Sequence, residues 1–130
     1  MDFKNKAADR LIRYAKIMTP SNAKSQTVPS SICQFDLAHV LVEELGEMGI
    51  DNAYADDKCY VYASIPATEG KENCPAIGFI AHMDTVSDYT RTQVTPMVWE
   101  NYDGRNLALP GGRVIRAEYF PHLSSLAGRL

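Results

Sequence analysis

Apolar residues recurring every three or four positions predict an amphipathic helix over residues 2–18. Its apolar stripe comprises Phe3, Ala7, Leu11, Ala15 and Met18. Asp9 and Arg13 lie four positions apart, a spacing that favours an ion pair along one helix face. Prolines at positions 20 and 29 lie in the polar segment 19–30, which we therefore expect to be a loop.

A second amphipathic helix is predicted after this loop. Ser31 and Gln34 have the spacing of a capping box, in which two side chains bind backbone N–H groups at a helix start. Gly49 is placed to end the helix. The apolar stripe between these signals comprises Leu37, Val40, Leu41, Leu45 and Met48.

The pattern beyond Gly49 changes from helical to extended. Residues 52–55 and 59–65, separated by Asp56-Asp57-Lys58, predict a β-hairpin. Residues 76–81 form an unbroken apolar run, which is typical of a strand covered on both faces. We therefore expect residues 76–81 to lie centrally in a sheet.

The pattern is weaker toward the carboxyl end. Short strands are predicted at residues 97–99 and 113–116, with a turn at 101–106 and a break at 110–112. Pro121 is placed to open a final helix that carries Leu123, Leu126, Ala127 and Leu130. Helices and strands in this order predict an α/β fold, with helices packed on a mixed sheet.

Composition favours a single globular domain covering residues 1–130, since 45% of the residues are hydrophobic and 22% are charged. The formal net charge of -3, without a basic run, argues against nucleic acid or an anionic membrane as partner. The three cysteines are widely spaced, and no pair has the two-residue spacing typical of a structural metal or redox site. We therefore expect reduced thiols. With neither a signal peptide nor a membrane span of about 20 apolar residues, we expect a cytoplasmic protein.

His82 and Asp84 directly follow the apolar run 76–81 and are the strongest candidates for chemistry. If the strand continues through them, their side chains point to the same side of the sheet. A histidine can then bind a metal ion through one ring nitrogen while the carboxylate holds the other N–H. The alternative is a chance pair of loop residues without a metal.

For the other candidate residues, a structural role is favoured over metal or ligand binding. The pair Glu43-Glu44 is expected on a solvated helix face, and Asp56-Asp57 in a turn. His39 and His122 are expected at the surface or partly packed. Packing is favoured over base stacking for Tyr60 and Tyr62, and Gly111-Gly112 lacks the third glycine of a phosphate loop.

Several stretches together resemble the amino-terminal portion of the peptidase T family, tripeptide aminopeptidases of the dinuclear-zinc exopeptidase superfamily. They extend along nearly the whole chain, in the order and spacing of the family. The matching stretches are LAHVL with EEL at residues 37–45, YVYA at 60–63, IPA at 65–67, IGFIAHMDT at 77–85 and ENYDG at 100–104.

This resemblance implies a three-layer α/β/α zinc-exopeptidase catalytic domain of which only the front portion is present. It implies that His82 is a zinc ligand and that Asp84 is the active-site carboxylate orienting it. Two zinc ions, with a glutamate as base, would activate water against the first peptide bond of a short peptide. The remaining metal ligands would lie beyond residue 130.

A catalytic zinc site needs about three protein ligands, so we expect the 130-residue chain to be inactive alone. The alternative function is that of a non-enzymatic, truncated or degenerate interaction protein. A partial domain leaves strand edges and apolar faces uncovered, which favours a homodimer or other self-association.

Overall fold

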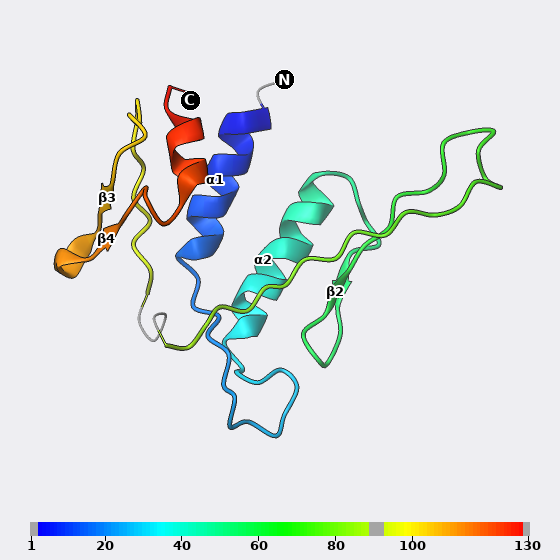
Figure 1. Ribbon diagram of the computed structural model, residues 1–130. Helices are drawn as coiled ribbons and strands as arrows, with labels where there is room; N and C mark the ends of the chain where they lie inside the picture. Colours follow the sequence, from blue (N-terminus) through cyan, green and yellow to red (C-terminus); the bar gives the residue numbers. More distant parts are fainter. Residues whose placement is uncertain (1–2, 89–92, 129–130) are drawn as a thin grey trace. The chain divides into compact units, whose positions relative to one another are not determined.

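The computed structural model describes residues 3–88 and 93–128, with side chains from residue 5 onward. It divides into two units, residues 1–96 and 97–130. Both contain helical turns and short antiparallel strands, so the prediction of mixed helices and strands is confirmed (Figure 1). Part of the polar stretch 86–95, which we expect to be an exposed loop, and Leu130 of the predicted last helix fall outside the described residues.

Helix α1 spans Phe3–Ala15 within the predicted range 2–18. It ends early because the N–H groups of Lys16 and Ile17 bond three residues back, to Arg13 and Tyr14, in a tighter turn. Pro20 also disfavours helical backbone at the preceding residue. The predicted Asp9–Arg13 ion pair is not present in the described residues, because Arg13 binds Glu44 of the second helix instead.

Helix α2 spans Gln34–Glu47, as predicted, and its C-cap Met48 is followed by Gly49 with φ +84°. The capping-box prediction is wrong, since no side chain caps the start of the helix. Gln34 is instead buried, and its side-chain amide donates to the Pro20 carbonyl. A residue expected to cap α2 therefore ties the preceding loop to it.

The predicted first hairpin is present but short. Strand β1 (Tyr54–Ala55) pairs antiparallel with β2 (Val61–Tyr62), with Tyr54 opposite Tyr62. The Asp56 carboxylate accepts the N–H groups of Lys58 and Tyr60, which confirms a turn role for this residue. In the described residues the hydrophobic core of the chain is small, comprising Leu37, Ala38 and Cys59.

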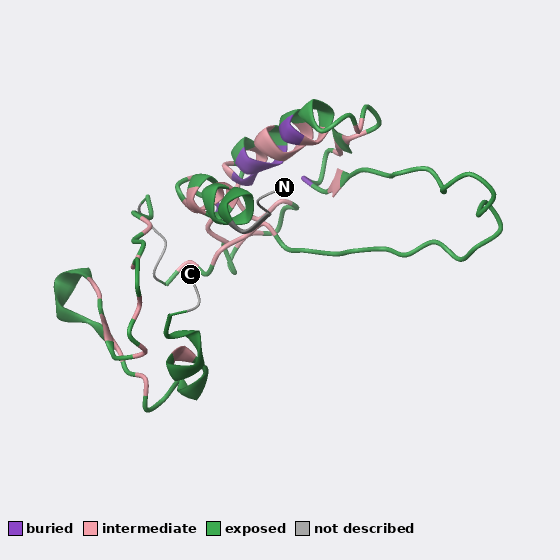
Figure 2. Cartoon of the chain, turned by 90° about the horizontal axis from the view of Figure 1, so that it is seen from above, coloured by how far each residue is buried: buried purple, intermediate pink, exposed green. Residues whose placement is uncertain are grey.

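Residues 76–81 do not form the buried central strand that the apolar run predicted. They belong to no strand, and Ile77, Phe79 and Ile80 are 82%, 95% and 100% exposed. Figure 2 shows the whole stretch 62–82 as exposed chain. The described residues offer this segment no neighbouring strand, because their sheets are two separate two-stranded ribbons. The described residues therefore do not confirm the mixed sheet of the predicted three-layer architecture.

The second unit contains strand β3 (Leu107–Ala108), the 3₁₀ turn η1 (Pro110–Gly112) and strand β4 (Val114–Ile115). The strands pair antiparallel around the predicted break. The final helix begins at Pro121 as predicted, but it is the 3₁₀ helix η2, Pro121–Leu126. The predicted strand at residues 97–99 is absent from the described structure. No helix among the described residues is long and apolar enough to span a membrane.

Candidate functional site

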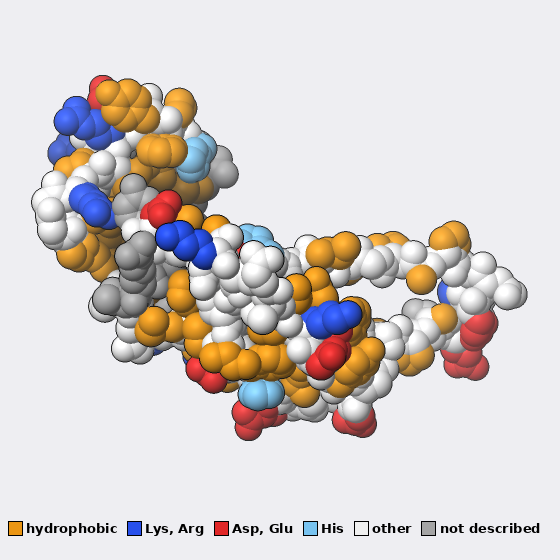
Figure 3. Space-filling view, turned by 90° about the horizontal axis from the view of Figure 1, so that it is seen from below, with side chains coloured by type: hydrophobic (Ala, Val, Ile, Leu, Met, Phe, Trp, Pro, Cys, Tyr) orange, Lys and Arg blue, Asp and Glu red, His pale blue; other side chains and the backbone are white. Residues whose placement is uncertain are grey.

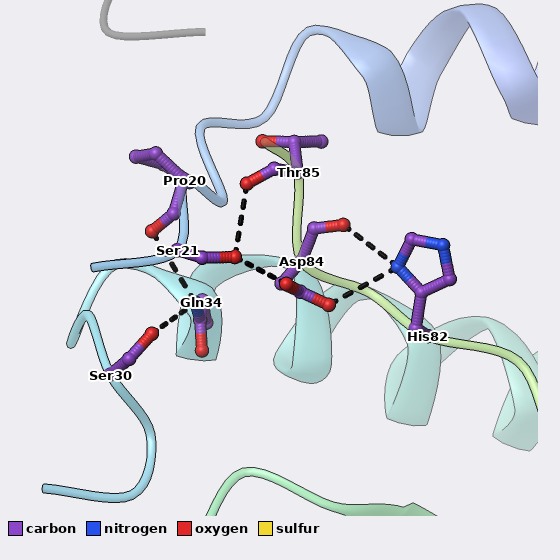
Figure 4. A network of polar contacts seen from close by, with 7 residues as sticks. All are labelled: Pro20, Ser21, Ser30, Gln34, His82, Asp84 and Thr85. Atoms are coloured by element: carbon purple, nitrogen blue, oxygen red, sulfur yellow. Dashed lines mark hydrogen bonds and ion pairs between the residues drawn. The ribbon is translucent and has the colours of Figure 1, made fainter. Parts of the chain in front are cut away.

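His82 and Asp84 contact each other directly. The Nδ1 atom of His82 lies 2.9 Å from the Asp84 carbonyl oxygen and 3.1 Å from Asp84 Oδ1 (Figure 4). Both oxygens can only accept a hydrogen bond, so Nδ1 carries the proton of the neutral ring. The lone pair of the imidazole is then on Nε2, and the His82 side chain is 85% exposed. This is the tautomer that can bind a metal through Nε2.

The Asp84 carboxylate has a second partner on another segment of the chain. Its Oδ2 atom accepts a hydrogen bond from the Ser21 hydroxyl. This bond, followed by the contact with His82, lowers the pKa of Asp84 against the opposing effect of burial. The carboxylate is therefore ionised at neutral pH and remains a hydrogen-bond acceptor for the imidazole.

Backbone pairing brings Ser21 to Asp84. The N–H of Thr85 donates to the Thr19 carbonyl at 2.9 Å, and the N–H of Ser21 donates to the Thr85 carbonyl at 2.8 Å. Pro20 and Thr85 thereby form an isolated parallel bridge. Thr19 is only 2% exposed, so residues 19–21 form an anchored support for the loop that carries Asp84.

An open hollow of about 640 Å³ lies beside these groups. The two segments of the bridge contribute most of its wall, and three of the lining residues, Ser21, Ser30 and Ser87, carry hydroxyls. It is lined by residues 21–23, Ser30, His82, Asp84, Val86 and Ser87. A small ligand can therefore reach His82 and Asp84 from solvent.

Of the other candidate residues, His39 does not line this hollow. His39 and His122 are exposed, as expected, and each ring lies near a phenylalanine, Phe35 or Phe120. Tyr60 and Tyr62 are also exposed, and the Tyr62 ring stacks on Tyr54 at 5.3 Å. Among the residues that the structure describes, no three His, Cys, Asp or Glu side chains are grouped so that they could hold a metal ion.

The prediction that Glu44 lies on a solvated helix face is wrong. Glu43 is exposed as predicted, but Glu44 is 8% exposed and binds helix α1 rather than solvent. Its carboxylate accepts hydrogen bonds from Arg10, Arg13 and Tyr14. Burial acts to raise its pKa, but these hydrogen bonds lower it to about 2.

One sequence signal pointed to this cluster. Arg10, Arg13 and Tyr14 are spaced at three and four positions, which places them on one face of α1. Two cations and a phenol on one helix face can surround a carboxylate from a neighbouring helix. The cluster fixes α1 against α2 and belongs to the architecture, since all four side chains lie away from the hollow lining.

Comparison with known proteins gives a consistent set of relatives. No protein-family model matches the chain. The chain is 46% identical over 127 residues to a protein named Peptidase T from Bacillus licheniformis, covering 96% of the chain. It is 42% identical over 126 residues to a protein of that name from Lysinibacillus sphaericus, and 42% over 130 residues to one from Bacillus cereus. The chain spans only 31% of the length of each of these relatives.

Proposed function

Because this chain belongs to the peptidase T family and matches its amino-terminal portion, we propose that His82 and Asp84 form part of the catalytic centre of a zinc-dependent aminopeptidase. The parent enzyme would release the amino-terminal residue from tripeptides. The observation that carries this proposal is the contact of His82 Nδ1 with Asp84, which leaves Nε2 accessible.

The residues fit a zinc ion as one part of a larger ligand set. A neutral imidazole whose far nitrogen is held by a carboxylate is a favourable zinc ligand. When bound, zinc polarises a peptide carbonyl and makes water a better nucleophile at neutral pH. His82 would hold the ion, and Asp84 would keep the ring oriented and its proton on Nδ1. The described residues hold no group of three metal ligands, so the second zinc ion and the remaining ligands would require other residues.

The same proposal accounts for the exposed apolar run. In a complete three-layer zinc-exopeptidase domain, residues 76–81 would be an inner strand with neighbours on both sides.

The three free thiols, Cys33, Cys59 and Cys74, favour the reducing cytoplasm as the compartment of the protein.

The proposal predicts that the isolated chain is inactive and that activity returns in a complete domain. Purified chain with zinc and a tripeptide should show no turnover above background, because one histidine cannot form a catalytic zinc site. A chimera in which this chain replaces the matching part of the Bacillus licheniformis relative should release the amino-terminal residue. The measurement is chromatography of the products. Turnover by the chain alone, or a folded chimera without activity, would contradict the proposal.

The exposed run also supports a second candidate, self-association of the chain. No described residue forms a hydrogen bond with the backbone of residues 76–81, so both edges of this segment can pair with another strand. Its apolar side chains are nearly fully exposed, and Figure 3 shows hydrophobic groups spaced along the projecting part of the chain. A second copy could cover them by strand pairing about a two-fold axis.

Light scattering over a wide concentration range tests self-association. We expect a dimer, and we expect Phe79→Lys to raise its dissociation constant by about tenfold or more, because a charge would be placed at the interface. Ile32→Lys is the matched control, since Ile32 is 79% exposed and lies outside the run. A monomer at every concentration would exclude this function.

A further inference from the structure

We propose that Ser21 is a positioning residue for the His82–Asp84 pair, holding the carboxylate so that one oxygen faces the imidazole. The inference deepens the proposed function and depends on it for its catalytic meaning. The contact itself lies between residues 63 positions apart, so it is not a local turn interaction.

The two carboxylate oxygens of Asp84 have different partners. Oδ2 accepts the Ser21 hydroxyl, whereas Oδ1 lies 3.1 Å from His82 Nδ1. A terminal carboxylate torsion is soft, so one contact alone would leave the group free to rotate. With Ser21 bound to one oxygen, the other is held toward the ring. Ser21 therefore acts on the imidazole through Asp84.

The Ser21 hydroxyl has one alternative acceptor, the Thr85 carbonyl at 3.1 Å. A hydroxyl has one proton and can satisfy only one of these acceptors fully. The carboxylate is the stronger acceptor because it is charged. The donor is therefore directed to Asp84, while the carbonyl is already bonded by the Ser21 N–H.

Ser21 is presented from a fixed segment, unlike an ordinary surface serine. Backbone bonds on both sides of Thr85 attach residues 19 and 21 to the Asp84 loop. Pro20 between them has a restricted φ, and its carbonyl accepts from the Gln34 amide at 3.4 Å. Figure 4 shows this network extending from α2 through residues 20 and 21 to Asp84 and His82. The position of the hydroxyl is thus set before any ligand binds.

The test is the tautomer of His82 in the metal-free chain, measured by long-range ¹H–¹⁵N NMR above the ordinary imidazole pKa of about 6.5. Wild-type His82 should be protonated mainly on Nδ1. Ser21→Ala should lower the ratio of Nδ1-protonated to Nε2-protonated ring by about threefold to tenfold, the effect of one hydrogen bond. Ser21→Thr should retain the wild-type ratio because it keeps the hydroxyl.

Ser87→Ala is the matched control, because Ser87 lines the same hollow but makes no described contact with Asp84. The chain contains three histidines, so unchanged signals from His39 and His122 report an intact fold. An unchanged His82 ratio in folded Ser21→Ala overturns the proposal. If Ser21→Ala does not fold, Ser21→Cys, a weaker donor, is compared with Ser21→Thr, and equal ratios in these two variants overturn it.

A zinc titration of the same samples separates this inference from the proposed function. Weaker zinc binding in Ser21→Ala than in Ser87→Ala is expected. If the tautomer shifts but His82→Gln leaves zinc affinity unchanged, the proposed metal role fails while the positioning role of Ser21 stands. If His82→Gln weakens zinc binding but Ser21→Ala leaves the His82 tautomer ratio unchanged, the positioning role of Ser21 fails while the proposed metal role stands.

Discussion

Replacing His82 with glutamine in the chimera should lower kcat/KM for a tripeptide by about a thousandfold or more, since metal-dependent hydrolysis depends on every ligand that fixes the ion. Glutamine has similar bulk but lacks the imidazole lone pair that lies free on Nε2. The side chain is 85% exposed, so its replacement should not disturb packing. Bound zinc, measured by elemental analysis after gel filtration, should fall together with activity.

Asp84→Asn should have a smaller effect on the same chimera. The amide has the shape of the carboxylate but no charge and only one acceptor oxygen, so it can accept from His82 Nδ1 or from Ser21 but not from both. Loss of such an orienting partner typically lowers activity or metal affinity by about 10–100-fold. His39→Gln is the control, because His39 is exposed and lies outside the hollow lining. Equal activities of the His82 and His39 variants would exclude His82 as a ligand.

The elements that sequence predicted correctly are those determined by neighbouring residues. The spacing of apolar residues marked α1 and α2, and Gly49 marked the end of α2. Asp56 fixes the first hairpin turn through bonds to residues two and four positions away. Such interactions are complete within a short stretch of chain, so the pattern was sufficient.

The failures involve partners distant in sequence. An inner strand is stable only when other strands and helices cover it, and the described residues supply none for residues 76–81. Glu44 was expected in solvent because the residue pattern of its own helix does not indicate that it is buried. Its partners, Arg10, Arg13 and Tyr14, lie at least 30 residues earlier. Likewise, the two-residue spacing suggested the His82–Asp84 contact, but nothing in the sequence pattern indicated Ser21.

Glu44→Gln should destabilise the chain by about 1–3 kcal/mol at neutral pH, the range for a buried charge-assisted hydrogen bond. The glutamine amide replaces one acceptor oxygen with a donor, which then faces the guanidinium groups of Arg10 and Arg13. Urea unfolding followed by circular dichroism measures the change. Glu43→Gln is a matched control on the adjacent, exposed residue, and its effect should stay within about 0.5 kcal/mol.

The same variant gives a pH signature that locates the effect at the carboxylate. The pKa of Glu44 is about 2 in the folded chain against an ordinary value of 4.5. Between these values the unfolded chain binds a proton that the folded chain does not, so the free energy of unfolding falls as pH falls. The stability difference between wild type and Glu44→Gln should therefore be complete above about pH 4.5 and shrink toward pH 2. A difference that stays constant across this range would mean that Glu44 stabilises the helix pair by packing rather than by charge.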